Sequence, residues 1–222
     1  MSAVNTEQAR FNMIEQQIRP WDVLDQRVLR LFDEVPREAF VPEAYRNLAF
    51  ADIEIPLGQG ETMMSPKLEG RMLQALAVQS GDRVLEVGTG SGFVTACLAR
   101  LADEVTSIEI DETLAEQARA RLAEQGADNV VLRSGDALAM AEETNTYDAI
   151  AVTGSLPLEE QAEVFKRSLT LGGRLFLVLG EAPVMQAVLI TRVGQDQYTL
   201  ESLFETELPA LRNARQPERF AF

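Results

Sequence analysis

The stretch VLEVGTGSG, residues 84–92, decides the fold. An apolar run ends in three glycines, and residues 93–101 follow it with the pattern of a helix. Glycine lets the main chain turn sharply and approach a ligand closely. A strand, a glycine turn and a helix together form the ligand-binding unit of an open α/β sheet, in which ligands bind beyond the carboxyl ends of the strands.

Strand-like and helix-like segments alternate after this loop. The near-continuous apolar strands favour a parallel sheet that is covered on both faces, and the order of the segments predicts a doubly wound α/β fold. The last two strands have no helix between them, so we expect an antiparallel hairpin with its turn at residues 194–195. The predicted strands are 84–87, 105–110, 129–133, 147–153, 174–179, 186–192 and 198–205, and the predicted helices are 93–101, 114–124 (with Asp111 as N-cap) and 158–168.

The first 80 residues have a different pattern, with helices and loops interrupted by prolines. We expect an N-terminal cap region at residues 1–80 and a ligand-binding α/β domain at residues 81–222. Helices are predicted at residues 6–18 and 24–34, and a turn or short helix between the prolines of residues 35–42.

Composition excludes several classes of protein. The 222 residues include 35 acidic and 20 basic side chains, for a net charge of −15, so we expect neither nucleic acid nor an anionic membrane as a partner. Histidine is absent, which excludes a Ser-His-Asp mechanism and a histidine-ligated metal. Cys97 is the single cysteine and no long apolar run is present, so we expect a cytoplasmic protein.

The spacing of the loop glycines indicates the kind of ligand. Dinucleotide folds use G-x-G-x-x-G, whereas this chain has G-x-G-x-G and lacks a phosphate-binding lysine, which suits a nucleoside without phosphates. Glu109 ends the second strand and can accept both ribose hydroxyls, and Asp136 follows the next strand and can orient an adenine. Glu86 and Glu109 make the pocket mouth negative, which suits the cation S-adenosylmethionine. The candidate cofactor-binding residues are Glu86, Gly88, Thr89, Gly90, Ser91, Gly92, Glu109, Ile110, Asp136 and Ala137, with no metal ligands.

Further motifs extend this interpretation over residues 30–180, and they are VPREAFVP (35–42), IPLGQGET (55–62), GDAL (135–138), YDAIAVTG (147–154) and LGGRLFLVLG (171–180). With them the sequence resembles the protein-L-isoaspartate O-methyltransferase family. The resemblance implies a class I methyltransferase fold with a seven-stranded sheet and S-adenosylmethionine as cofactor. It also implies methyl transfer to the free carboxylate of isoaspartyl residues in damaged proteins, with Thr62 near the methyl group.

One departure from the family pattern concerns the acceptor. The family has Thr-Ile-Ser-Gln-Pro where residues 62–66 read TMMSP, so the family's active-site serine falls on Met64 and the glutamine before the threonine falls on Glu61. A thioether cannot donate a hydrogen bond to a carboxylate, and Glu61 would repel one. Either Ser65 has taken over the hydroxyl role, or the acceptor is different. Ser65 also has the sequence of a helix N-cap, because Pro66 and an amphipathic stretch follow it.

Thr62 and Ser65 are therefore the candidate catalytic residues, and Thr153 and Ser155 are further hydroxyls that can hold an anion. Three function classes remain open: an isoaspartyl carboxyl methyltransferase acting on proteins or peptides, a methyltransferase for a small molecule or another protein, and a non-catalytic cofactor-binding protein. The C-terminal tail carries three arginines and is either a frayed end or a segment that brings positive charge to the acceptor. These arginines are Arg212, Arg215 and Arg219.

Overall fold

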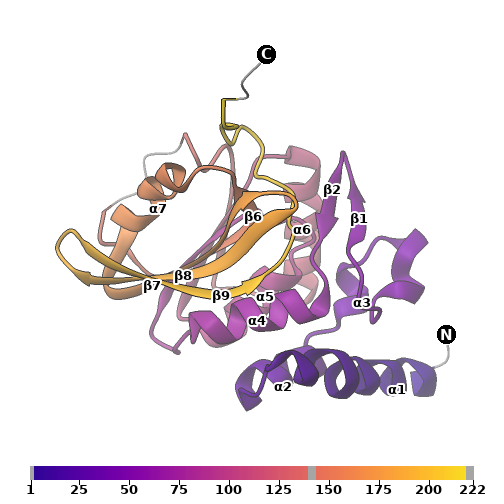
Figure 1. The fold of residues 1–222 in the computed structure, drawn as a ribbon. Coiled ribbons are helices and arrows are strands. Elements are labelled where there is room, and N and C mark those ends of the chain that lie inside the picture. The colour runs from indigo at the N-terminus through magenta and orange to yellow at the C-terminus, as the bar shows by residue number, and fades with distance from the viewer. Residues whose placement is uncertain (1–2, 140–143, 219–222) are drawn as a thin grey trace.

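A seven-stranded sheet with the order β5-β4-β3-β6-β7-β8-β9 forms the centre of the molecule (Figure 1). The computed structural model describes residues 3–139 and 144–218. The five strands from β5 to β7 are parallel, whereas β8 is antiparallel to both β7 and β9. The predicted mostly parallel sheet and its C-terminal hairpin are therefore confirmed. The strands are β3 Arg83–Val87, β4 Glu104–Glu109, β5 Val130–Ser134, β6 Tyr147–Leu156, β7 Leu169–Glu181, β8 Val184–Gly194 and β9 Gln197–Glu205.

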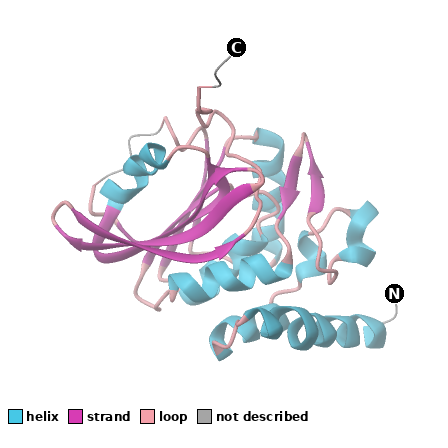
Figure 2. Cartoon of the chain, viewed as in Figure 1, coloured by secondary structure: helices cyan, strands magenta, loops and turns pink. Residues whose placement is uncertain are grey.

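Helices surround this sheet, as Figure 2 shows in cyan. Asp111 caps α6 as predicted, because its carboxylate accepts the main-chain N–H groups of Thr113 and Leu114. Within residues 3–139 and 144–218, no helix is long and apolar enough to cross a membrane. The helical segments are α1 Ala3–Met13, η1 Ile14–Ile18, η2 Arg19–Trp21, α2 Gln26–Glu34, α3 Arg37–Phe40, η3 Glu43–Leu48, α4 Pro66–Leu76, α5 Phe93–Leu101, α6 Glu112–Glu124, η4 Glu159–Ala162 and α7 Glu163–Ser168.

Alternate residues of the central strands belong to two separate hydrophobic clusters, one on each face of the sheet. In β7, Phe176 and Val178 pack with the cluster that contains α2, α4 and α5. Leu175 and Leu177 pack instead with the cluster that contains Phe165 of α7. Since side chains alternate across a strand, apolar residues at consecutive positions bury both faces of the sheet.

The N-terminal region contains a two-stranded hairpin that the sequence did not predict. Strand β1 (Ile55–Gly58) pairs antiparallel with β2 (Glu61–Met63). The chain before residue 80 shares a hydrophobic cluster with the chain after it, through side chains such as Phe32, Phe40 and Phe93. The division of the chain near residue 80 therefore remains a proposal. The apolar residues of the two segments form a common hydrophobic core.

Candidate functional site

A pocket lies at the carboxyl ends of the parallel strands, where the glycine loop (residues 88–92) leaves β3. Its walls include the glycine loop, the residues that follow β4, the residues that follow β5, strand β2 with Met64, residues 153–154 of β6, and residues 208–212 near the C-terminus. This is the edge at which an open α/β sheet binds its ligands.

The glycine loop is shaped by three residues with positive φ, namely Gly88, Gly90 and Gly92. A Cβ atom on Gly88 would lie 2.4 Å from the hydroxyl oxygen of Thr153. That hydroxyl is already engaged, because it donates to the carbonyl of Gly88 at 2.6 Å. A side chain at position 88 would therefore be strained and would collide with a fixed neighbour, so the loop requires glycine there.

Glu86 forms the buried floor of the pocket beneath this loop. Its side chain is fully buried, and one carboxylate oxygen accepts hydrogen bonds from Thr95 and from Ser107, the latter at 2.6 Å. The hydroxyl of Thr89 lies 2.6 Å from that of Ser107 and extends the network into the loop. The second carboxylate oxygen, Oε1, has no partner among the described residues.

Burial raises the pKa of Glu86 to about 8, against the opposing effect of its hydroxyl donors. At neutral pH the side chain is therefore mostly protonated. The expectation that Glu86 adds negative charge to the pocket stays a prediction, since burial at the floor favours the neutral form until a cation or another donor stabilises the charge.

Glu109 and Asp136 lie at the ends of neighbouring strands, as predicted. Glu109 accepts the main-chain N–H groups of Gly90 at 2.7 Å and of Asp111 at 2.9 Å, so it fixes the position of the glycine loop. Asp136 accepts the N–H of Leu138 at 2.9 Å and lines the same pocket. Two carboxylates from sequence-distant positions thus converge on one side of the cavity.

The pocket brings together most of the residues predicted for cofactor binding. Gly92 is the exception: a Cβ there would lie 3.3 Å from Ala118, so this glycine allows close packing of the loop against α6 and does not line the pocket. The predicted residues that line the pocket are Glu86, Gly88, Thr89, Gly90, Ser91, Glu109, Ile110, Asp136 and Ala137.

The acceptor side of the pocket is formed by Thr62, Met63 and Met64. The hydroxyl of Thr62 donates to Glu54 at 3.3 Å, a long bond that an incoming ligand can replace. Met64 lines the pocket and is only 5% exposed, so a thioether occupies the wall where the family resemblance places a serine.

Ser65 does not line the pocket. It is the N-cap residue of α4, as predicted, but its side chain makes no capping hydrogen bond. Its carbonyl accepts the N–H groups of Leu68 and Glu69, so the main chain turns away into the helix directly after Met64. The structure therefore does not bring the Ser65 hydroxyl to the site, and the same holds for Ser155, which is buried outside the pocket lining.

Arg37, from the motif of residues 35–42, fixes the main chain of the acceptor side. It is fully buried, donates to the carbonyl of Met64 at 2.8 Å and to that of Ala49 at 2.9 Å, and pairs with Glu69. Its guanidinium group also lies over the ring of Phe93, 4.8 Å from the centroid. Burial raises the pKa of Glu69 to about 8, and the charge of Arg37 opposes that rise.

Residues 208–214, here called the C-terminal strap, complete the pocket. Ser155 donates its N–H to the carbonyl of Pro209 at 2.8 Å, and Leu211 donates back to the carbonyl of Ser155 at 3.0 Å. The strap therefore runs beside the end of β6 and places Arg212 in the pocket wall. The sequence left two alternatives for the arginine-containing tail, a frayed end or a segment that brings positive charge to the site. Arg212 agrees with the second, because it lines the pocket. Arg215 is 69% exposed, and Arg219 lies outside the described residues.

A family model and the curated relatives indicate the same family. The family model described as protein-L-isoaspartate(D-aspartate) O-methyltransferase (PCMT) matches residues 8–208. A protein-L-isoaspartate O-methyltransferase 1 of Rhodopseudomonas palustris (strain HaA2) is 39% identical over 203 residues, which cover 91% of this chain and 82% of the relative. A protein-L-isoaspartate O-methyltransferase of Opitutus terrae is 42% identical over 180 residues, 79% of this chain and 76% of the relative.

A solved structure supports the fold independently of sequence identity. The crystal structure of a Plasmodium falciparum beta-aspartate methyltransferase (PCMT), in complex with S-adenosyl-L-homocysteine, superposes with a TM-score of 0.77. It covers 93% of this chain and 97% of its own, at 19% identity. At this low identity the comparison is evidence for the fold alone. The superposition confirms the seven-stranded α/β architecture.

Proposed function

Because the chain belongs to the protein-L-isoaspartate(D-aspartate) O-methyltransferase family, we propose that it methylates the free carboxylate of L-isoaspartyl residues in damaged proteins and peptides. It is an S-adenosylmethionine-dependent methyltransferase. The observation that carries the proposed acceptor chemistry is the continuity of the site: one pocket is lined both by the glycine loop and by Thr62.

The residues of the pocket fit S-adenosylmethionine. The buried Oε1 of Glu86 has no partner among the described residues, so it can accept a hydrogen bond from an ammonium group once the carboxyl group is ionised, and the bare Cα of Gly88 keeps the loop open. When bound, this cofactor supplies a methyl group activated by a positively charged sulfur. The residues we propose to hold it are Glu86, Gly88, Thr89, Gly90, Ser91, Glu109, Ile110, Asp136 and Ala137, with Gly92 supporting the loop from behind.

The chain needs no general base for this reaction. A carboxylate acceptor with a pKa of about 4 is already ionised at neutral pH. The task left to the protein is to orient that carboxylate and remove its water. Thr62 is our proposed hydrogen-bond donor to the acceptor, and Met63 and Met64 supply an apolar wall beside it. This division of labour agrees with a chain that contains no histidine.

Met64 is the observation that favours a second candidate, a methyltransferase for a different acceptor. A thioether at this wall offers no hydrogen bond, and the Ser65 hydroxyl does not reach the pocket to replace it. For this second candidate, the acceptor is a less polar small molecule or another protein group. The part of the pocket that binds the cofactor is the same for both candidates.

A methylation assay separates the two candidates. Two peptides of the same sequence, one with a normal aspartyl and one with an isoaspartyl linkage, are incubated with radiolabelled S-adenosylmethionine. We expect base-labile methyl ester on the isoaspartyl peptide alone, and about a 10-fold loss of turnover in Thr62→Val, which keeps the shape but removes the donor. Labelling of neither peptide by a protein that still binds S-adenosyl-L-homocysteine would favour the second candidate.

We also propose a cytoplasmic location. Cys97 is buried and unpaired, which agrees with a reducing compartment. Isoaspartyl proteins and peptides are the proposed partners, and the excess of acidic side chains makes nucleic acid and anionic membranes poor ones.

A further inference from the structure

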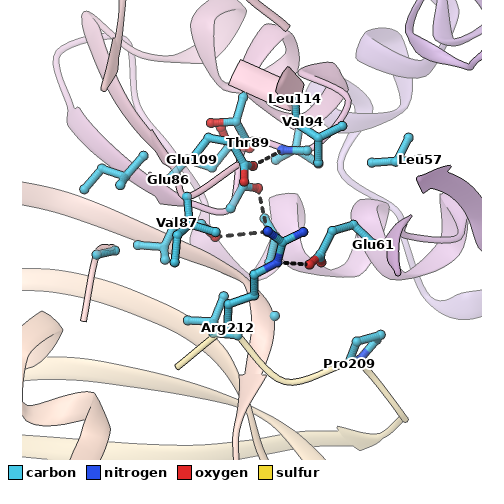
Figure 3. A pocket seen from close by; sticks show the side chains of 18 of the residues that line it. Leu57, Glu61, Glu86, Val87, Thr89, Val94, Glu109, Leu114, Pro209 and Arg212 are labelled. Atoms are coloured by element: carbon cyan, nitrogen blue, oxygen red, sulfur yellow. Dashed lines mark hydrogen bonds and ion pairs between the residues drawn. The ribbon is translucent and has the colours of Figure 1, made fainter. Parts of the chain in front are cut away.

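Arg212 joins two carboxylates that lie far apart in the sequence. Its Nε donates to Glu61 Oε1 at 2.6 Å, and its Nη1 lies 3.2 Å from Asp111 Oδ2. The third nitrogen, Nη2, is enclosed and has no partner among the described residues. Figure 3 shows the guanidinium group between Glu61 and the side of the pocket where Thr89 and Glu109 lie. The two carboxylates therefore determine where this positive charge sits.

The charges around the pocket are strongly unbalanced. Within the part of the chain that the structure describes, Arg212 is the one cationic side chain that lines the pocket. Five carboxyl groups line it as well: Glu61, Glu69, Glu86, Glu109 and Asp136. An anionic acceptor that enters this pocket meets an environment of its own sign, and like charges at short distance disfavour binding.

Four of these carboxyl groups are accounted for without Arg212. Glu69 pairs with Arg37, and Glu86 is mostly protonated at neutral pH. Glu109 accepts two main-chain N–H groups, and Asp136 accepts one main-chain N–H group and the side-chain amide of Asn213 at 2.9 Å.

The fifth carboxyl group, Glu61, differs from these four in place and in partner. It directly precedes Thr62 on β2, and both residues line the acceptor side. Its carboxylate pairs with Arg212. Of the five carboxyl groups that line the pocket, Glu61 is therefore the one whose charge Arg212 compensates.

Resting on the proposed function, we propose that Arg212 is a positioning residue for the acceptor: it neutralises Glu61, so that an isoaspartyl carboxylate can approach Thr62. The main-chain bonds between the C-terminal strap and Ser155 hold Arg212 at this place. The same pairing explains how a glutamate is compatible with a carboxylate substrate at a position where the family resemblance indicates a glutamine.

Four proteins test this assignment: the wild type, Arg212→Gln, Glu61→Gln and the double variant Glu61→Gln/Arg212→Gln. We measure KM and kcat for an isoaspartyl peptide at saturating S-adenosylmethionine, at low and high NaCl. Arg212→Gln should raise KM about 10-fold with kcat within about 3-fold, and high salt should shrink that difference. Glu61→Gln should lower KM by about 2- to 5-fold, because Arg212 then has one carboxylate fewer to neutralise.

The double variant decides the question. If charge compensation is the role of Arg212, removal of both charges returns KM to within about 3-fold of the wild type. If Arg212 only holds the strap in place or contacts the peptide itself, the double variant stays as impaired as Arg212→Gln, and the proposal is overturned. An unchanged KM in Arg212→Gln overturns it as well. Arg212→Lys keeps the charge and should keep KM within about 3-fold, which separates charge from fold.

Binding measurements keep this test distinct from the proposed function. Calorimetric titration of the same peptide into each protein loaded with S-adenosyl-L-homocysteine should give dissociation constants that follow the KM values. A wild type that binds the peptide without methylating it overturns the proposed function, while the binding series still decides the role of Arg212. A wild type that neither binds nor methylates the peptide overturns both.

Discussion

The cofactor half and the acceptor half of the pocket are built in different ways. In the cofactor half, one short loop forms much of the wall. Gly88 and Gly90 of this loop have positive φ, and the Glu109 carboxylate accepts the main-chain N–H of Gly90. In the acceptor half, strand β2, Met64 and the C-terminal strap meet only because the chain folds, and the buried Arg37 holds the main chain at Met64. Local sequence therefore determines the first half, and long-range packing determines the second.

Replacement of Gly88 by alanine is expected to have the largest effect, and it should be confined to the cofactor half. The new Cβ would lie 2.4 Å from a Thr153 hydroxyl that is itself hydrogen-bonded, at a φ of +91°. We expect affinity for S-adenosyl-L-homocysteine to fall by at least about 100-fold, since strain of this kind costs on the order of 1–3 kcal/mol before the clash is added. Isothermal calorimetry measures the loss.

Gly126→Ala is the matched control for this substitution. Gly126 also has positive φ, at +65°, but a Cβ there meets no atom within 4 Å and the residue lies outside the pocket lining. It should lose about 1 kcal/mol of stability and keep its cofactor affinity. Equal losses of affinity in both variants would mean that backbone strain, and not the shape of the loop, explains the result.

The two buried glutamates beneath the pocket give a comparison through pH. Burial raises the pKa of Glu86 to about 8. The folded protein thus keeps a proton that the unfolded chain releases near pH 4.5, so the stability from this group is complete at low pH and declines as pH rises to about 8. Relative to Glu86→Gln, the wild type should lose on the order of 1–3 kcal/mol of unfolding free energy between pH 5 and pH 8.5. Urea unfolding at several pH values measures this, and parallel curves would contradict it.

Glu69→Gln should behave differently, because the guanidinium group of Arg37 lies against Glu69 and opposes the rise in its pKa that burial causes. Its loss leaves Arg37 fully buried without its charge partner, which is destabilising at every pH. A pH-dependent gain in stability in Glu69→Gln would mean that the pair is neutral in the folded protein, and that Arg37 holds the acceptor side by its hydrogen bonds alone.

The same contrast explains which features could be predicted from sequence. The pattern of residues 93–101 predicted α5 with its observed bounds, and the carboxylates after β4 and β5 were placed at the pocket because parallel strands end at one edge. The hairpin β1–β2 was missed, because its strands have only four and three residues and its turn contains a glutamine, Gln59, at positive φ. The sequence left open whether the tail that contains Arg212 reaches the site. The position of Arg212 depends on the pairing of the strap with Ser155, which no local sequence pattern reveals.

Met64→Ser tests the acceptor half directly and should have a modest effect. If the site takes an isoaspartyl carboxylate, a hydroxyl at this wall adds a hydrogen bond, and kcat/KM should rise by about 2- to 10-fold with cofactor affinity unchanged. Met63→Ser is the matched control, because Met63 also lines the pocket and is equally buried but falls on the family's isoleucine. A loss of turnover in Met64→Ser alone would instead indicate an apolar acceptor.

Ser65→Ala should have the smallest effect of all, because its hydroxyl belongs to neither half. The residue begins α4 without a side-chain capping bond and does not line the pocket. An N-cap serine that makes its bond contributes about 1 kcal/mol, so here we expect a change in unfolding free energy below about 0.5 kcal/mol. We also expect KM and kcat on the isoaspartyl peptide to stay within about 2-fold, since no bond to substrate is lost. A 10-fold loss of turnover would mean that the start of α4 rearranges when substrate binds and that Ser65 has taken over the hydroxyl role after all. The acceptor half would then be formed by the substrate as much as by the fold.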